Sequence, residues 1–157
     1  MAALRLFHKL RLAAFALSVV SFASAAEPLL GIWHLARQEV DGQKIDSSPL
    51  TLEISQTGGE LSFAFSVPGN HVNVVRMTYV LKLDGSEADV KNEKGEKIGT
   101  IQMAHAGPSQ YKLVLKRSGH HDSAGQLTVS SDGKTLTSEA DTVQAGRPVH
   151  SSQQFLR

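Results

Sequence analysis

The stretch LTLEISQTGGELSFAFSV, residues 50–67, decides the fold class of this chain. Apolar and polar residues alternate through residues 50–55 and again through residues 61–67, with the pair Gly58-Gly59 between the two runs. An alternation of period two places one set of side chains on each face of a β-strand. Two such runs joined by a glycine pair are typical of a β-hairpin. This stretch therefore predicts two antiparallel strands.

Outward from this hairpin, short β-rich runs fill the chain and are separated by turn signals, several of them Asp-Gly pairs. In the run that follows the hairpin, Met77 and Tyr79 share an apolar face opposite Arg76. The further runs lie at residues 74–83, 88–91, 98–104, 111–116, 127–129, 136–140 and 149–155.

No helical periodicity of ten or more residues appears from residue 27 onward, and only residues 41–49 leave room for a brief helix. Consecutive short strands with tight turns predict an up-and-down antiparallel meander. Such a sheet avoids exposed edges by closing into a barrel or by stacking as a sandwich. We therefore expect an all-β fold, a single antiparallel meander of about 8–10 strands closed into a barrel. No break in composition divides residues 27–157, which we interpret as one domain.

Residues 1–26 are typical of a cleavable bacterial signal peptide. Three basic residues and no acidic one precede Glu27, and residues 12–22 form an apolar stretch that small residues follow. We predict cleavage after Ala25 or Ala26. The apolar stretch is shorter than the roughly 20 residues that a spanning helix needs, so no stable membrane anchor is expected in the mature form. The mature protein is predicted to be periplasmic or secreted.

Charge and cysteine content exclude several classes of function. The chain has 16 basic and 15 acidic residues. Removal of Arg5, Lys9 and Arg11 with the leader leaves thirteen basic against fifteen acidic residues, a formal charge of −2. No basic run remains that could neutralise a row of phosphates, so no nucleic acid partner is expected. The absence of cysteine from the sequence excludes disulfides, thiol catalysis and thiolate metal sites.

Several motifs carry a family resemblance. They are LLGIWHL at residues 29–35, TLEI at 51–54, YVLKLDG at 79–85 and LTVSSDGKTLT at 127–137. Together they resemble exported lipocalin-like (calycin-type) bacterial domains of uncharacterised function, over nearly the whole mature chain. The resemblance implies a lipocalin-like β-barrel and places Trp33 across its closed end, beneath a ligand cavity. The chain departs from typical lipocalins because it lacks disulfides and the usual helix before the last strand.

Apolar side chains on the inward positions of the strands are the candidates for ligand contact, because ligand cavities are mostly apolar with a few polar groups. Trp33 and Phe155 are expected to fill the core instead. The alternative is that the whole aromatic set fills the interior and leaves no cavity. The candidate ligand-binding residues are Phe63, Phe65, Tyr79 and Leu113.

Catalytic and metal sites find little support in the sequence. In the run GHHDS at residues 119–123, His120, His121 and Asp122 suit a divalent metal. No third ligand stands at a recognisable spacing, so a solvated turn is the preferred interpretation, and no metal or other cofactor is expected. The chain has no Gly-x-Ser-x-Gly elbow and no glycine-rich phosphate cradle. We predict that the protein is not an enzyme and name no catalytic residue.

Two functional hypotheses remain. The first is an exported, non-enzymatic domain that binds a small apolar or amphipathic molecule. The alternative is a structural or protein-interaction domain of the cell envelope with an envelope protein as partner, for example a β-barrel protease inhibitor or envelope stress protein. The small β domains of envelope stress proteins share the Gly-x-Trp-x-Leu opening followed by an Asp-Gly turn, here Asp41-Gly42. An open apolar cavity favours ligand binding, whereas a filled interior with an apolar surface patch favours protein interaction.

Overall fold

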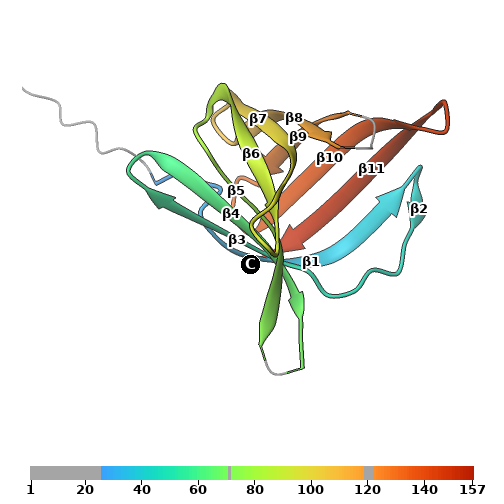
Figure 1. Ribbon diagram of the computed structural model, residues 1–157, viewed down its shortest axis with the longest axis horizontal. Coiled ribbons are helices and arrows are strands. Elements are labelled where there is room, and N and C mark those ends of the chain that lie inside the picture. The colour runs from blue at the N-terminus through green and yellow to red at the C-terminus, as the bar shows by residue number, and fades with distance from the viewer. Residues whose placement is uncertain (1–25, 71, 119–121) are drawn as a thin grey trace, which may run out of the picture.

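The computed structural model describes residues 26–70, 72–118 and 122–157, so the predicted leader lies almost entirely outside the described residues. Within those ranges the regular secondary structure consists of β-strands only (Figure 1). None of the described residues belongs to a helix that could cross a membrane. The strands are β1 (Gly31–Val40), β2 (Gln43–Lys44), β3 (Thr51–Thr57), β4 (Glu60–Pro68), β5 (Asn73–Leu81), β6 (Asp84–Asn92), β7 (Lys97–Gly107), β8 (Gln110–Arg117), β9 (Ser123–Val129), β10 (Thr135–Gln144) and β11 (Arg147–Leu156).

The strands form one antiparallel sheet that closes on itself. From β3 to β11 each strand pairs with the next strand along the chain, and β1 pairs with both β3 and β11. The two-residue strand β2 pairs only with the end of β1, so ten strands make the wall of the barrel. The expected fold class, a closed antiparallel meander, is confirmed. The expectation of a brief helix at residues 41–49 is wrong, because β2 and irregular chain occupy that segment.

The hairpin that decided the fold class forms as predicted. Strand β3 pairs with β4 in a regular register that sets Leu52 opposite Phe65. Gly58 and Gly59 make the turn with φ angles of 59° and 85°. Both angles lie in the left-handed region, where a side chain with a Cβ is disfavoured.

Strand β5 departs from the predicted alternation at one position. Met77 lies opposite Phe65, but Val75 already lies opposite Ser66, so Arg76 is an extra residue without a partner on β4. A β-bulge of this kind redirects side chains and locally bends the strand. As a result Arg76 faces the barrel interior together with Met77, although the sequence pattern placed it on the outer face.

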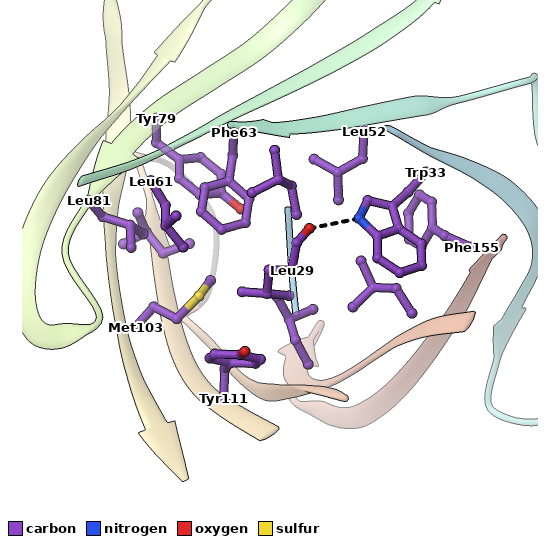
Figure 2. Packing of buried hydrophobic residues seen from close by; sticks show 14 of the residues in the cluster. Leu29, Trp33, Leu52, Leu61, Phe63, Tyr79, Leu81, Met103, Tyr111 and Phe155 are labelled. Carbon is purple, nitrogen blue, oxygen red and sulfur yellow. Dashed lines mark hydrogen bonds between the residues drawn. The ribbon is translucent and has the colours of Figure 1, made fainter. Parts of the chain in front are cut away.

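A hydrophobic core fills one end of the barrel (Figure 2). No polar or charged side chain is buried among the described residues. Full burial of one large apolar side chain stabilises a fold by about 1.5–3 kcal/mol, so this layer is the main source of stability. Its fully enclosed members include Leu29, Trp33, Leu52, Leu61, Phe63, Val90, Met103, Tyr111, Leu136 and Phe155.

Candidate functional site

The rest of the barrel interior is a cavity of about 890 Å³. Ligand pockets in proteins commonly have volumes of roughly 300–1,000 Å³, so the cavity has room for a small-molecule ligand. A ten-stranded barrel is wider than an eight-stranded one, whose side chains nearly fill the interior. The apolar lining residues are Val40, Leu50, Leu52, Phe65, Met77, Tyr79, Ile101, Leu113, Leu115, Leu127, Leu136, Ala140, Val143, Ala145 and Phe155.

The N-terminal segment and Trp33 close the end of the barrel below the cavity. Leu29 lies outside the sheet, yet its side chain is fully buried among the core residues (Figure 2). Trp33 is also fully buried, and its Nε1–H donates a hydrogen bond of 2.8 Å to the Leu29 carbonyl. The Arg157 guanidinium stacks on the Trp33 ring with Cζ 4.1 Å from the ring centroid. The prediction that Trp33 packs in the core at the closed end is confirmed.

A carboxylate anchors the same N-terminal segment. The Tyr111 hydroxyl donates a hydrogen bond to Glu27, and the His105 Nε2 lies 3.7 Å from the other Glu27 oxygen. Burial, and then the hydrogen bond to the Glu27 carboxylate, raise the pKa of the Tyr111 hydroxyl. Tyr111 therefore stays protonated at ordinary pH and can act as a constant donor. The contact ties the segment that precedes β1 to β8.

Three of the four candidate ligand residues lie on the cavity wall. Phe65 of β4, Tyr79 of β5 and Leu113 of β8 all line the cavity. Phe63 does not line it: its side chain is fully buried and stacks on the Tyr79 ring with centroids 4.7 Å apart (Figure 2). Phe63 lies two residues closer to the closed end than Phe65, where the core already fills the barrel. Alternation in the sequence identifies the inner face but not the depth at which packing gives way to open space.

Tyr79 brings a polar atom into the apolar part of the wall. Its side chain makes no hydrogen bond within the described part of the chain. Burial raises the pKa of the Tyr79 hydroxyl, so the group is neutral at physiological pH. The hydroxyl can therefore donate one hydrogen bond to a molecule in the cavity or accept one from it.

A polar wall faces the cavity from β1, β10 and β11. Strands β10 and β11 pair along their whole length, so alternate residues of both strands must point inward. The predictions from sequence did not identify this wall. The available signal was that residues 137–140 and 150–154, within two predicted strands, contain no large apolar residue. The polar wall comprises Gln38, Ser138, Thr142, Gln144, Ser151 and Gln153.

Two arginines stand at the rim of the cavity, opposite its closed end. Arg76 is paired with Glu93 at 2.5 Å, and both side chains are largely exposed. Arg117, the last residue of β8, is exposed and makes no ion pair within the described residues. Arg117 can therefore attract an anion to the rim, whereas the charge of Arg76 is offset by Glu93.

The described residues show no arrangement for metal binding. No group of three or more histidine, aspartate or glutamate side chains that could hold a metal ion occurs among them. His120 and His121 of the weaker metal hypothesis lie outside the described residues. Asp122 is described, and its backbone carbonyl accepts a hydrogen bond of 3.2 Å from the Thr142 hydroxyl.

The chain forms a closed ten-stranded antiparallel barrel with an internal cavity. Neither a protein-family model nor a curated protein matches the chain. Among solved structures, the zebrafish ileal bile acid-binding protein in complex with cholic acid is similar, with a TM-score of 0.57 and 18% identity over 83% of this chain and 98% of that one. The siderocalin Ex-FABP, described as having dual ligand specificities, matches with a TM-score of 0.38 and 14% identity over 83% of this chain and 70% of that one.

Proposed function

We propose that this protein is an exported, non-enzymatic binding protein that holds a small apolar or amphipathic molecule inside its barrel. The observation that carries the proposal is the cavity of about 890 Å³ above a fully packed closed end. An internal void of this size reduces the packing that stabilises a fold. A role in binding a molecule explains why the fold retains a cavity that lowers its stability.

The chemistry of the wall favours binding over catalysis. The described lining residues include no histidine, aspartate, glutamate or lysine, so none of them supplies a general base next to a serine. The zebrafish protein that shares the fold was solved with cholic acid. A barrel of this fold can therefore bind a small molecule, and the present cavity of about 890 Å³ lies within the usual range of ligand pockets.

A fluorescent fatty acid such as anthroyloxy-labelled stearate tests the proposal. We expect saturable binding at micromolar concentrations, which corresponds to about −8 kcal/mol. Phe65→Leu should weaken the probe about 2- to 10-fold because Leu lacks the ring faces of Phe65, while costing less than about 1.5 kcal/mol of stability. Val80→Ala, on the outer face of β5 and 51% exposed, is the matched control and should leave binding unchanged. Binding that ignores every inward substitution would place the probe on the outer surface and contradict the proposal.

Export is part of the same proposal, and the basic, apolar and small-residue regions of residues 1–26 support it. We propose a periplasmic or secreted location in a bacterium. Mature protein recovered from cells should begin at Ala26 or Glu27, which intact mass spectrometry measures directly. Recovery of exported protein that still carries Met1 would contradict cleavage.

A second candidate function is docking to another envelope protein. Exposed valines near the end of the β4–β5 hairpin favour it, with Val72 73% and Val75 41% exposed. Native mass spectrometry of protein purified from its own cells separates the two candidates. A retained small molecule supports the binding protein, whereas a retained protein partner and an empty barrel support the interaction domain.

A further inference from the structure

The polar wall begins directly above the floor of the cavity. Phe155 forms part of that floor, and the next inward residue of β11 is Gln153. In the sheet, Gln153 is paired with Gln38 of β1 on one side and with Ser138 of β10 on the other. These three side chains therefore make one row of hydrogen-bonding groups across adjacent strands, deep inside the barrel.

Further polar residues continue this row toward the rim. Ser151 follows Gln153 at the next inward position of β11, where it is paired with Val40 of β1 and Ala140 of β10. Thr142 and Gln144 lie beyond Ala140 along β10. Polar groups therefore recur from the floor to the β10–β11 turn, and the deepest row is the one in which all three paired residues are polar. No acidic or basic side chain belongs to the polar wall, and the two rim arginines stand on the other strands β5 and β8.

The deepest row lacks internal partners. The side chains of Gln38, Ser138 and Gln153 are half-buried and make no hydrogen bond within the described part of the chain. Each carboxamide offers two donors and one acceptor oxygen. Covering these groups with a hydrocarbon would leave them unsatisfied, which costs free energy. A molecule that fits the cavity well must hydrogen-bond to this row or leave water beside it.

The opposite wall has the reverse chemistry. In the strand order of the closed sheet, β4 to β8 face the side formed by β10, β11 and β1. The inward residues of these strands are mainly apolar. They include Phe65, Met77, Ile101, Leu113 and Leu115.

We infer that the cavity selects a facially amphipathic ligand, which has uncharged hydroxyl or amide groups along one flank of an apolar body. The inference rests on the proposed binding function and narrows the class of ligand. A molecule with a polar group only at one end satisfies the rim but not the row of Gln38, Ser138 and Gln153. A facial amphiphile pairs with both walls at once.

Matched fatty acids test the inference, because they share a chain length and a carboxylate. The probes are octadecanoate and a dihydroxyoctadecanoate with adjacent hydroxyls at mid-chain, each measured by displacement of the anthroyloxy-labelled stearate. Wild-type protein should bind the dihydroxy acid at least as tightly as octadecanoate. In the double variant Gln38→Leu/Gln153→Leu, the ratio of the two Kd values should shift by about tenfold in favour of octadecanoate, through the loss of hydrogen bonds to the hydroxyls.

Two further variants keep the test independent of folding. Ser138→Ala removes a single oxygen from the row and should shift the ratio in the same direction by a smaller factor. Gln154→Leu changes the adjacent carboxamide of β11, which is exposed on the outer face, and should leave the ratio unchanged. If both acids bind and the ratio is equal in wild type and in all inward variants, facial selection is wrong but the binding function stands. If neither acid nor the labelled probe binds, the binding function itself fails.

Discussion

Truncation of Trp33 to alanine should nearly exhaust the stability of the fold. Removal of a large, fully buried aromatic side chain costs about 3–5 kcal/mol through lost burial and the cavity left behind, and Trp33 is 0% exposed. The variant also leaves the Leu29 carbonyl without its 2.8 Å partner, which adds about 1–3 kcal/mol for a buried acceptor. Loss of the Arg157 stacking contact adds about 0.5–1 kcal/mol. A domain of this size has only about 5–15 kcal/mol to lose.

Urea unfolding followed by far-ultraviolet circular dichroism is the appropriate assay. Trp33 is the single tryptophan of the sequence, so its own fluorescence cannot report on the variant. Trp33→Ala should lose at least about 4 kcal/mol or fail to fold. Trp33→Phe keeps an aromatic ring and loses mainly the hydrogen bond, so it should lose less, about 1–3 kcal/mol.

Ile32→Ala is the matched control, because Ile32 is the adjacent residue of β1 and is 53% exposed. Its stability should stay within about 0.5 kcal/mol of wild type. The reasoning is refuted if Trp33→Ala unfolds within about 1 kcal/mol of wild type, because the closed end would then not depend on this side chain.

Three further predictions concern charge, pH and close packing. Arg117→Gln should weaken octadecanoate binding several-fold at low salt and flatten its salt dependence in calorimetric titrations, since Arg117 lies at the rim and makes no ion pair within the described residues. An equal loss for a neutral alcohol of the same length would contradict this. The hydrogen bond that the His150 ring donates to the Asp141 carboxylate raises the pKa of His150. The pair therefore stabilises the fold fully below about pH 6.5, and its contribution is lost as pH rises through the raised pKa. Urea titrations of wild type and His150→Gln should therefore converge at alkaline pH, and a difference that grows with pH would count against the pairing. Gly125→Ala should lower the free energy of unfolding by about 1–3 kcal/mol or more, because a Cβ there would lie 2.1 Å from the Glu139 carbonyl oxygen. Thermal melts would measure the loss, with Ala124→Ser at the adjacent exposed residue as the control. Equal melting temperatures for the two variants would contradict the prediction.

The β-hairpins and the closed meander could be predicted because burial on one side of a sheet imposes an alternation that is visible in the sequence. Leu52, Phe65 and Tyr79 all appear on the inner face that the pattern indicated. Strand ends were harder to predict. Strand β6 begins at Asp84, within an Asp-Gly pair interpreted as a turn, because pairing with β7 fixes polar residues into the sheet regardless of their own preferences.

Only the apolar part of the candidate site could be predicted from the sequence, for a related reason. Phe65, Tyr79 and Leu113 belong to the apolar part of the wall, where inward positions look like core positions. Gln38 and Gln153 look like surface residues in the sequence, because pattern analysis equates polar with exposed to bulk water. In a barrel with an internal cavity, a polar side chain can instead face the cavity. The bulge that turns Arg76 inward adds one residue to the strand, which no alternation rule anticipates.

The seam between the first and last strands sets an order on folding. Strand β1 is completed only by β11, and the Arg157 guanidinium donates hydrogen bonds of 2.7 Å to the carbonyls of Pro28 and Leu30, 129 and 127 positions away. Closure of so long a loop carries a large entropy cost, and contacts of high sequence separation slow folding. The barrel therefore cannot close until β11 is available to pair with β1. If the protein is exported as we propose, this delay would keep the chain extended during its passage across the membrane, and the pairing of β11 with β1 would complete the fold afterwards.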